Sequence, residues 1–477
     1  MSQAKNSITI YSGNHQGHLD QNQLQNINSI PGFAVVKQSK ESNFEKGLFN
    51  LKFDDVAAYI DPTTVNFSIP DNPEAAAILD QNFQFDLVST DKLLLKYLDQ
   101  TITVNHNLGN QSISTQGKLL STEGGLTLQI NNDQVTTIRA WNTIDFPALP
   151  GGLLTKPTLV WLLNSQTSKP QTIALTYQTK GMTWWADYNV ILNNNHNNCS
   201  LDLSSWVTLV NKSGASYDQT QLKLIAGDVN RTQSQLDQPM VRRESYAKIA
   251  DNTFSEQSLY EYHMYKLPRK IDLPNNSTKQ IQLIQNTNNI KCNNILRFNG
   301  SQQVHINYHR PITDKSYFSS AENKVESFLN FENSKENNLG LPLPAGRVRV
   351  NMIDTADDSL EFIGEDSIDH TAKNKTITLK LGQSFDVTGQ RKQRQFEWLK
   401  NSITEQFEIT IDNQKNVTQQ VEIIEPLYRW SNWQITQHDE EYTQIDSSTI
   451  QFTVSVPAES SRTIKYTVLY QWPETFK

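Results

Sequence analysis

Cysteine, long hydrophobic runs and clustered positive charge are all scarce in this sequence of 477 residues. Two cysteines, Cys199 and Cys292, are too few for a disulfide framework, and the sequence leaves open whether they pair. The best apolar run, 159–163, has the length of a strand, which argues against a membrane-spanning helix. A net charge of -8, with no basic run beyond the short group at 391–394, argues against a nucleic-acid partner.

Several catalytic and targeting signals are also missing. The sequence contains no G-x-S-x-G, G-x-x-x-x-G-K, G-x-G-x-x-G, H-E-x-x-H or C-x-x-C motif, so the corresponding enzyme classes lose their main support and no cofactor is predicted. The first residues have neither the basic nor the apolar region of a secretion signal. This leaves two interpretations, a cytoplasmic protein or a mature exported one.

Amides and aromatic residues are abundant instead. Asn and Gln occupy 86 positions, which favours turns and polar strand faces over long helices. Nine Trp, 16 Tyr and 19 Phe provide enough large apolar side chains for packed cores, although the mean hydropathy is -0.57. We therefore expect a folded chain.

The apolar pattern predicts strands over most of the chain. Apolar and polar residues alternate in short segments such as 47–53 and 63–69, which is typical of strands with one polar face. Two short helices are predicted in the N-terminal third. One follows Asp71 and contains 75–79, and the other is capped by Ser89 or Thr90 and covers 92–98.

The chain length predicts about three domains, and the fold class is mainly β, with β-sandwiches of immunoglobulin-like type. The predicted units are an N-terminal β domain at 1–150 with a small Sm-like or SH3-like barrel at about 91–146, a central β-sandwich at 151–401 with an excursion at 229–257, and a C-terminal immunoglobulin-like sandwich at 402–477. Whether 156–228 and 258–400 form one sandwich or two stays open.

Four segments carry a family resemblance: 206–217, 222–231, 333–346 and 362–370. They resemble a bacterial family described only as a domain of unknown function, whose relatives are mucoidy inhibitor A-like proteins, and upstream segments match its branch with a short N-terminus. The resemblance implies a β-rich protein of the periplasm or cell surface and supplies no catalytic residues. A cytoplasmic location remains the alternative because this chain shows no secretion signal.

The acidic group Glu365, Asp366, Asp369 and His370 is the first candidate site. Carboxylates and an imidazole this close in sequence are able to ligate a divalent cation or to act as an acid and base pair. The alternative is a turn whose acids cap backbone N–H groups and pair with the nearby basic group at 391–394.

Two other segments are weaker candidates. The loop 333–346 is rich in Gly, Pro and Asn and is longer than an ordinary hairpin turn, which predicts an ordered loop that offers Lys335 and Glu336 to a ligand or packs between domains. His305 and His309 share a strand face and form a possible metal site without an evident third ligand.

Five tryptophans are candidate platforms for sugar stacking or, alternatively, core residues: Trp184, Trp185, Trp206, Trp430 and Trp433. Alternation places Trp184 and Trp185 on opposite faces of a strand, so one of them is expected at the surface or at a domain seam.

The sequence leads to two hypotheses of different classes. The first is a non-enzymatic cell-envelope protein that serves as a scaffold or binds a protein or glycan. The alternative is a metal-assisted hydrolase that uses Asp366, Asp369 and His370. The oligomeric state is not predicted.

Overall fold

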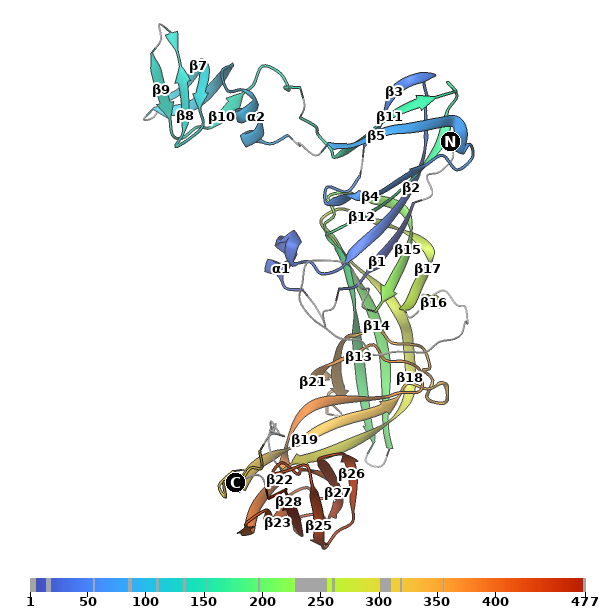
Figure 1. Ribbon diagram of the computed structural model, residues 1–477, viewed down its shortest axis with the longest axis vertical. Helices are drawn as coiled ribbons and strands as arrows, with labels where there is room; N and C mark the ends of the chain where they lie inside the picture. Colours follow the sequence, from blue (N-terminus) through green and yellow to red (C-terminus); the bar gives the residue numbers. More distant parts are fainter. Residues whose placement is uncertain are drawn as a thin grey trace.

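The computed structural model of this chain consists mainly of β-strands, which confirms the fold class predicted from the alternation of apolar and polar residues. The sheets follow one another along the long axis of the molecule (Figure 1). The residues that the structure describes are 6–13, 19–54, 56–84, 88–108, 111–131, 134–151, 153–195, 198–227, 255–259, 262–300, 310–317, 320–354 and 356–474.

Helices are short throughout the described residues. Helix α2 (Thr90–Lys96) begins after Ser89, whose hydroxyl accepts a hydrogen bond from the backbone N–H of Lys92, and it confirms the helix predicted at 92–98. Helix α1 (Gln21–Gln25) was not predicted; its residues lack an apolar stripe, and a capping box between Asp20 and Gln23 defines its start.

The helix predicted at 75–79 is wrong. Only the turn η2 (Pro73–Ala75) is helical, and the chain continues as strand β5 (Ala76–Gln84), which pairs with β11 (Thr158–Ser165). The alanines favour a helix locally, but hydrogen bonding to a strand about 80 residues away overrides that weak preference.

Two sheets form the N-terminal part of the fold, as far as it is described. In the larger sheet the strands follow the order β16 (Ser255–Leu259), β17 (Tyr262–Leu273), β15 (Tyr217–Ala226), β1 (Ser7–Tyr11), β2 (Phe33–Ser42), β12 (Gln171–Thr179) and β4 (Ile60–Ser68). The smaller sheet has the order β3 (Gly47–Phe53), β11 and β5. Apart from β16, the predicted excursion at 229–257 lies outside the described residues.

A separate five-stranded sheet follows α2 and stands apart from the rest of the molecule (Figure 1). Its order is β10 (Thr143–Asp145), β6 (Thr101–Leu108), β7 (Gln111–Ser121), β8 (Leu126–Gln129) and β9 (Val135–Ile138). It has a small core of its own, which includes Leu94 of α2 and Tyr97, the residue that caps the end of this helix. The predicted closed barrel is wrong: among the described residues the short β9 and β10 are the two edges and do not pair, so the sheet stays open.

The largest sheet contains thirteen strands within the described ranges. Its main path is β21 (Leu360–Ile368), β20 (Gly346–Ile353), β13 (Met182–Asn195), β14 (Asn198–Asn211), β18 (Ser277–Asn299), β19 (Ser320–Glu332), β22 (Thr376–Leu399), β23 (Ser402–Asn413), β28 (Ser460–Gln471) and β25 (Trp433–His438). Strands β24 (Gln419–Pro426), β26 (Tyr442–Asp446) and β27 (Thr449–Val456) branch from this path.

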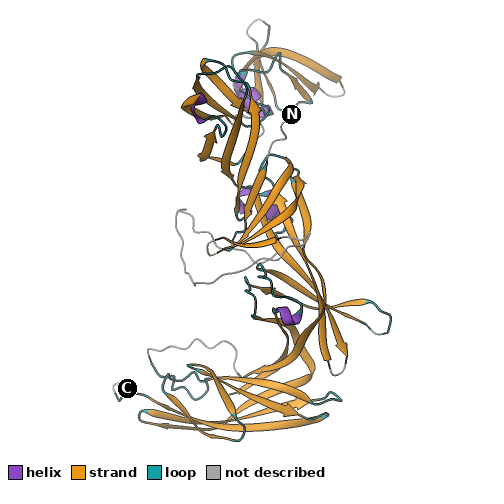
Figure 2. Ribbon diagram, turned by 90° about the vertical axis from the view of Figure 1, so that its right-hand side faces the viewer, coloured by secondary structure: helices purple, strands orange, loops and turns teal. Residues whose placement is uncertain are grey.

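Two cores lie along this large sheet. The main core includes residues from Ile8 to Leu379, and the C-terminal core includes residues from Leu296 to Trp472. Strands β18 and β22 contribute to both, and Figure 2 shows long strands curving from the middle of the molecule into its C-terminal part. The domain boundaries near 150 and 402 and the immunoglobulin-like topology stay predictions.

The two cysteines form a disulfide. Cys199 on β14 and Cys292 on β18 lie on neighbouring antiparallel strands, next to the directly opposed pair Ser200 and Lys291. Cys292 is buried in the main core and Cys199 packs against it. The sequence left open whether the two cysteines pair; the register of β14 and β18 brings them together.

Candidate functional site

The central strands β20, β13, β14 and β18 have an outer face, which points away from the main core. The polar groups best placed to bind a ligand lie on this face. Alternate residues of β13, such as Trp184 and Tyr188, point into the main core. The residues between them, including Asp187 and Asn189, point to the opposite side.

One row of residues crosses five strands on this outer face. In β-sheet register, Ser367 lies opposite Arg347, Arg347 opposite Asp187, Asp187 opposite Trp206, and Trp206 opposite Gln282. These residues come from β21, β20, β13, β14 and β18, in that order. Directly opposed residues on neighbouring strands point to the same side of a sheet, so the row forms one continuous strip.

Hydrogen bonds fix the orientation of Asp187 within this strip. Asp187 is 7% exposed, and its Oδ2 accepts hydrogen bonds from Trp185 Nε1 at 2.9 Å and Thr208 Oγ1 at 3.1 Å. Its Oδ1 accepts a hydrogen bond from Arg347 Nη2 at 3.2 Å. The Asp187 carboxylate thus has three donors and a fixed orientation.

A second row lies one step along the strands. Arg349, Asn189 and Ser204 are directly opposed across β20, β13 and β14, and Arg349 lies opposite Glu365 of β21. Arg349 Nε donates a hydrogen bond to Glu365 Oε2 at 3.2 Å, and Arg347 Nε lies 3.7 Å from the same oxygen. The two arginines and two carboxylates therefore balance in charge.

Several polar groups beside these ion pairs have no protein partner in the described part of the chain. Trp206 is 38% exposed, and its indole N–H makes no hydrogen bond there, whereas the indoles of Trp184 and Trp185 both donate one. The side chains of Asn189 and Gln282, both half-buried, also have none. Together with the ion-paired residues, these side chains form a surface that we call the Trp206 face. We define it by eight residues: Asp187, Asn189, Ser204, Trp206, Gln282, Arg347, Arg349 and Glu365.

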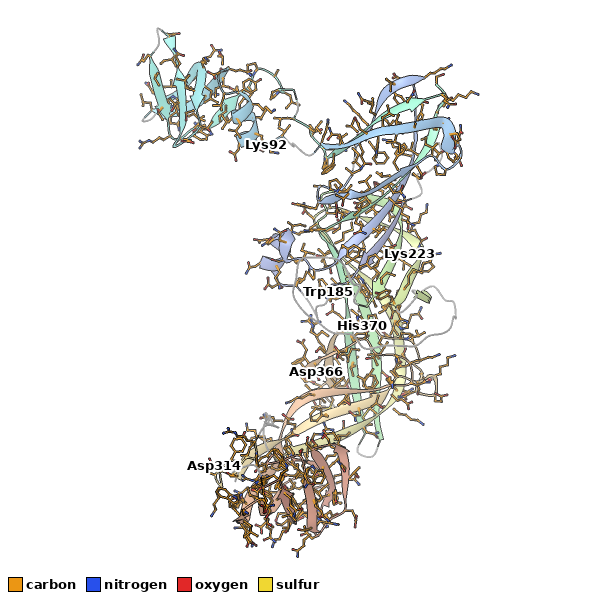
Figure 3. All side chains as sticks on the ribbon, viewed as in Figure 1. Lys92, Trp185, Lys223, Asp314, Asp366 and His370 are labelled. Carbon is orange, nitrogen blue, oxygen red and sulfur yellow. A yellow bond between two sulfur atoms is a disulfide. The ribbon has the colours of Figure 1, made fainter. Side chains whose placement is uncertain are left out.

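The N-terminal helical segment borders the Trp206 face. Trp185 precedes Asp187 on the same side of β13 and packs with Leu19, Ile30 and Val210 in a small separate core. Trp185 is thus covered, and Figure 3 labels it in the middle of the molecule. The prediction that Trp184 and Trp185 face opposite sides is confirmed, but both are buried.

The acidic group predicted from sequence is divided between different roles. Glu365 joins the Trp206 face. Asp366 points to β22, where its Oδ2 accepts a hydrogen bond from the backbone N–H of Lys380 at 2.7 Å and its Oδ1 accepts one from Ser367 N at 2.8 Å. His370 Nδ1 accepts a hydrogen bond from the backbone N–H of Ala345 at 3.0 Å (His370 and Asp366 are labelled in Figure 3).

These positions remove the support for a cation site in this group. The described ranges contain no set of three or more His, Cys, Asp or Glu side chains placed to hold a metal ion. Asp366 caps backbone N–H groups, and the backbone oxygen of Asp369 accepts a hydrogen bond from Thr371 Oγ1, as expected of a turn. Two of the basic residues predicted as partners pair elsewhere: Arg391 binds Glu425 and Arg394 binds Glu408.

The loop 333–346 is ordered by buried amides. Asn337 Oδ1 accepts a hydrogen bond from Lys291 N at 2.6 Å, and its Nδ2 donates to the oxygens of Lys291 and Glu332, each at 3.0 Å. Leu343 is buried in the main core. Lys335 and Glu336 are exposed on the short helix η4 (Lys335–Asn337), so the structure brings neither of them to the Trp206 face by any described contact.

The weakest metal candidates, His305 and His309, lie outside the described residues. Trp430 and Trp433 are half-buried against the C-terminal core, and Trp433 Nε1 donates a hydrogen bond to Ser447 O.

A second concentration of charge lies inside the C-terminal core. Arg391 Nε donates to Glu425 Oε2 at 2.8 Å, and both side chains are fully buried. Burial opposes the charge of Arg391, but its attraction to Glu425 raises the Arg391 pKa well above its ordinary value. Desolvation by burial likewise raises the pKa of Tyr466, which donates a hydrogen bond to Glu425.

The neighbouring pair extends this buried network to a surface segment. Arg429 contacts both oxygens of Glu405, at 2.6 and 2.8 Å, and both side chains are fully buried. Arg429 Nη1 also donates to the backbone oxygens of Ile312 and Asp314. Burial raises the pKa of the adjacent Tyr428 to about 12. Because these groups are enclosed, the network fixes the fold and offers nothing to a ligand.

Sequence reasoning missed six of the eight residues of the Trp206 face: Asp187, Asn189, Ser204, Gln282, Arg347 and Arg349. The alternation of Arg347 and Arg349 with Val348 and Val350 is a signal for charges on one strand face. It does not reveal that Asp187, 160 positions earlier, lies opposite Arg347 through the parallel pairing of β13 and β20.

The fold and the Trp206 face define a β-rich protein built from several sheets, with a polar aromatic surface on its central strands. A family model described as a domain of unknown function, DUF4139, matches residues 173–474, which is more than half of the chain. The protein therefore belongs to this family. No curated protein matches the chain.

Among the described residues, no helix combines the length and the apolar character needed to cross a membrane.

Proposed function

We propose that this protein is a non-enzymatic component of the cell envelope that binds a protein or glycan partner through the Trp206 face. The observation that carries the proposal is a set of polar side chains that have no hydrogen-bond partner among the described residues and surround an indole that is 38% exposed. Exposed groups fixed on strands lose little conformational freedom when a partner binds, which favours affinity.

The carboxylates of this face support binding over catalysis. Asp187 accepts three hydrogen bonds and Glu365 contacts two arginines. The oxygens of both carboxylates are therefore already engaged by protein donors. Such carboxylates orient neighbouring side chains, as a binding surface requires.

The disulfide supports an oxidising compartment for this function. Disulfides persist in the periplasm and at the cell surface and are rare in the cytoplasm. The bond between Cys199 and Cys292 is therefore consistent with the envelope location that the resemblance to mucoidy inhibitor A-like proteins implies. We therefore include the relationship to mucoidy inhibitor A-like proteins and the envelope location in the proposal.

Fractionation of the native host tests location. Cells expressing the natural gene are treated with a thiol-reactive polyethylene glycol before and after reduction. We expect the protein in the envelope fraction, with Cys199 and Cys292 modified only after reduction. Recovery from the cytoplasm with both thiols reactive contradicts the envelope location.

Binding is tested with the purified full chain and native envelope material separated into protein and polysaccharide fractions. We expect one fraction to bind, with the affinity reduced by Trp206→Ala. Trp141→Ala is the matched control, because that indole is 39% exposed but lies outside the Trp206 face. Equal binding by all three proteins contradicts the assignment of the site.

A further inference from the structure

The chemistry of the Trp206 face indicates which class of partner it takes. Resting on the proposed function, we infer that this face binds an uncharged glycan chain laid across strands β20, β13, β14 and β18. Four features of the face support this inference: its balanced charge, its amides, its indole and its length.

The balanced charge argues against an ionic ligand. Arg347 and Arg349 are matched by Asp187 and Glu365 within 3.7 Å, so each charge has an opposite charge beside it. A surface of this kind has little net field to attract a polyanion or a polycation. An acidic polysaccharide would also have to compete with the carboxylates for the arginines.

The unpaired side chains match the needs of sugar hydroxyl groups. A hydroxyl both donates and accepts hydrogen bonds, and the amides of Asn189 and Gln282 each offer two donors and an acceptor. Neither amide has a partner within the described residues, and Ser204 adds a hydroxyl beside Asn189. An uncharged polyol satisfies such groups without bringing an unpaired charge to the surface.

Trp206 supplies the apolar contact. Its ring is 38% exposed at the centre of the first row, with Asp187 on one side and Gln282 on the other. An indole presents a broad apolar surface to the C–H groups of a sugar ring, and its N–H remains available to a hydroxyl. The position of one ring between hydrogen-bonding side chains suits a ligand whose units have apolar faces and polar edges.

The composition of the face favours a glycan over a protein partner. Trp206 is one aromatic residue among seven polar ones in the defined face. The buried centre of a protein interface contains several apolar side chains and few charged ones. The row from Arg347 to Gln282 crosses four strands, or about 14 Å at the usual spacing between strands. This length accommodates several linked sugars.

The test uses the full chain with the disulfide intact and a panel of defined hexasaccharides. The uncharged probes are cellohexaose, laminarihexaose, maltohexaose and chitohexaose, and heparin hexasaccharide is the anionic comparator. Binding is measured by calorimetry and by a change in tryptophan fluorescence. We expect at least one uncharged probe to bind and Trp206→Ala to weaken it about tenfold or more, the loss expected for a stacked ring.

Further variants separate the contribution of the face from that of the fold. Gln282→Ala and Asn189→Ala should each weaken the same probe several-fold, while Trp141→Ala should leave its affinity unchanged. These three variants and Trp206→Ala should all stay folded at the assay temperature, because none of the four side chains is fully buried.

Three results overturn the inference. The first is binding of heparin hexasaccharide alone, and the second is binding of an uncharged probe that Trp206→Ala leaves unchanged. The third is a panel without any binding. If the panel fails but an envelope protein binds and is lost in Trp206→Ala, the proposed function stands and the glycan inference falls. If neither class of partner depends on Trp206, both fall.

Discussion

Arginine–carboxylate pairs occur both inside the C-terminal core and on the Trp206 face, but their surroundings differ. In the core, Arg429 and Glu405 are fully buried, and Arg429 also binds two backbone oxygens. On the Trp206 face, the side chains of Arg349 and Glu365 are each 40% exposed, and the amides of this face have no hydrogen-bond partner in the part of the chain that the structure describes. The same residue types thus stabilise a fold in one place and form a surface suited to recognition in the other.

The largest expected effect comes from breaking the buried pair. Arg429→Ala leaves Glu405 without its arginine partner in an enclosed site and removes the contacts to the segment 310–317, so we expect the C-terminal core to lose about 3–5 kcal/mol of stability. Urea unfolding measures this loss. The double variant Glu405→Ala/Arg429→Ala should lose less than the sum of the two single variants, since the partners are coupled.

The exposed pair Arg394–Glu408 is the matched control. Arg394→Ala should cost less than about 1 kcal/mol because water screens the charges of a surface ion pair. If Arg429→Ala is no more damaging than Arg394→Ala, the distinction between an internal and a surface network is lost.

The disulfide is expected to have the next largest effect. It closes a loop over a sequence separation of 93, and the variant Cys199→Ser/Cys292→Ser should lower stability by about 2–4 kcal/mol. Chemical unfolding with and without dithiothreitol measures this. The reductant should destabilise the wild type and leave the double variant unchanged; an equal response of both proteins would mean that the bond does not contribute.

A smaller effect is expected in the loop 333–346. Asn337→Ala removes three hydrogen bonds and leaves backbone groups of Lys291 without their partner, which should cost about 1–3 kcal/mol. Lys335→Ala and Glu336→Ala, on the same short helix, should be close to neutral because both side chains are exposed. Thermal unfolding of the three variants compares them directly, and a neutral Asn337→Ala would show that the loop is held in another way.

Local patterns predicted much of the secondary structure. Alternation identified the strands, and Ser89 marked the start of α2. The segment 75–79 was wrongly predicted as a helix because its partner strand, β11, lies far along the chain. Closure of a barrel depends on which edge strands pair, and local strand patterns do not encode that pairing.

The candidate site was predicted only in part. Glu365 was selected for its neighbours in sequence, whereas its partners in the structure are Arg347 and Arg349 on an adjacent strand. Trp206 was selected as a possible sugar platform, but its exposure depends on the side of the sheet that it occupies. Asp187 gave no signal because its role arises from a parallel pairing between distant strands, which local spacing does not encode.

The last comparison concerns the Trp206 face, where a small change in stability is the most informative for function. Trp206→Ala removes an indole that is 38% exposed and makes no described hydrogen bond, so the loss of stability should be only about 1 kcal/mol. Trp184→Ala, which empties a buried position on the opposite side of β13, should cost about 3–5 kcal/mol. Denaturant unfolding of the two variants provides the comparison. A large loss from Trp206→Ala would identify this indole as a structural residue and would remove the basis for assigning recognition to the Trp206 face. A small loss, together with weakened partner binding, would separate recognition from folding at this position, because the fold would then tolerate a change that the partner does not.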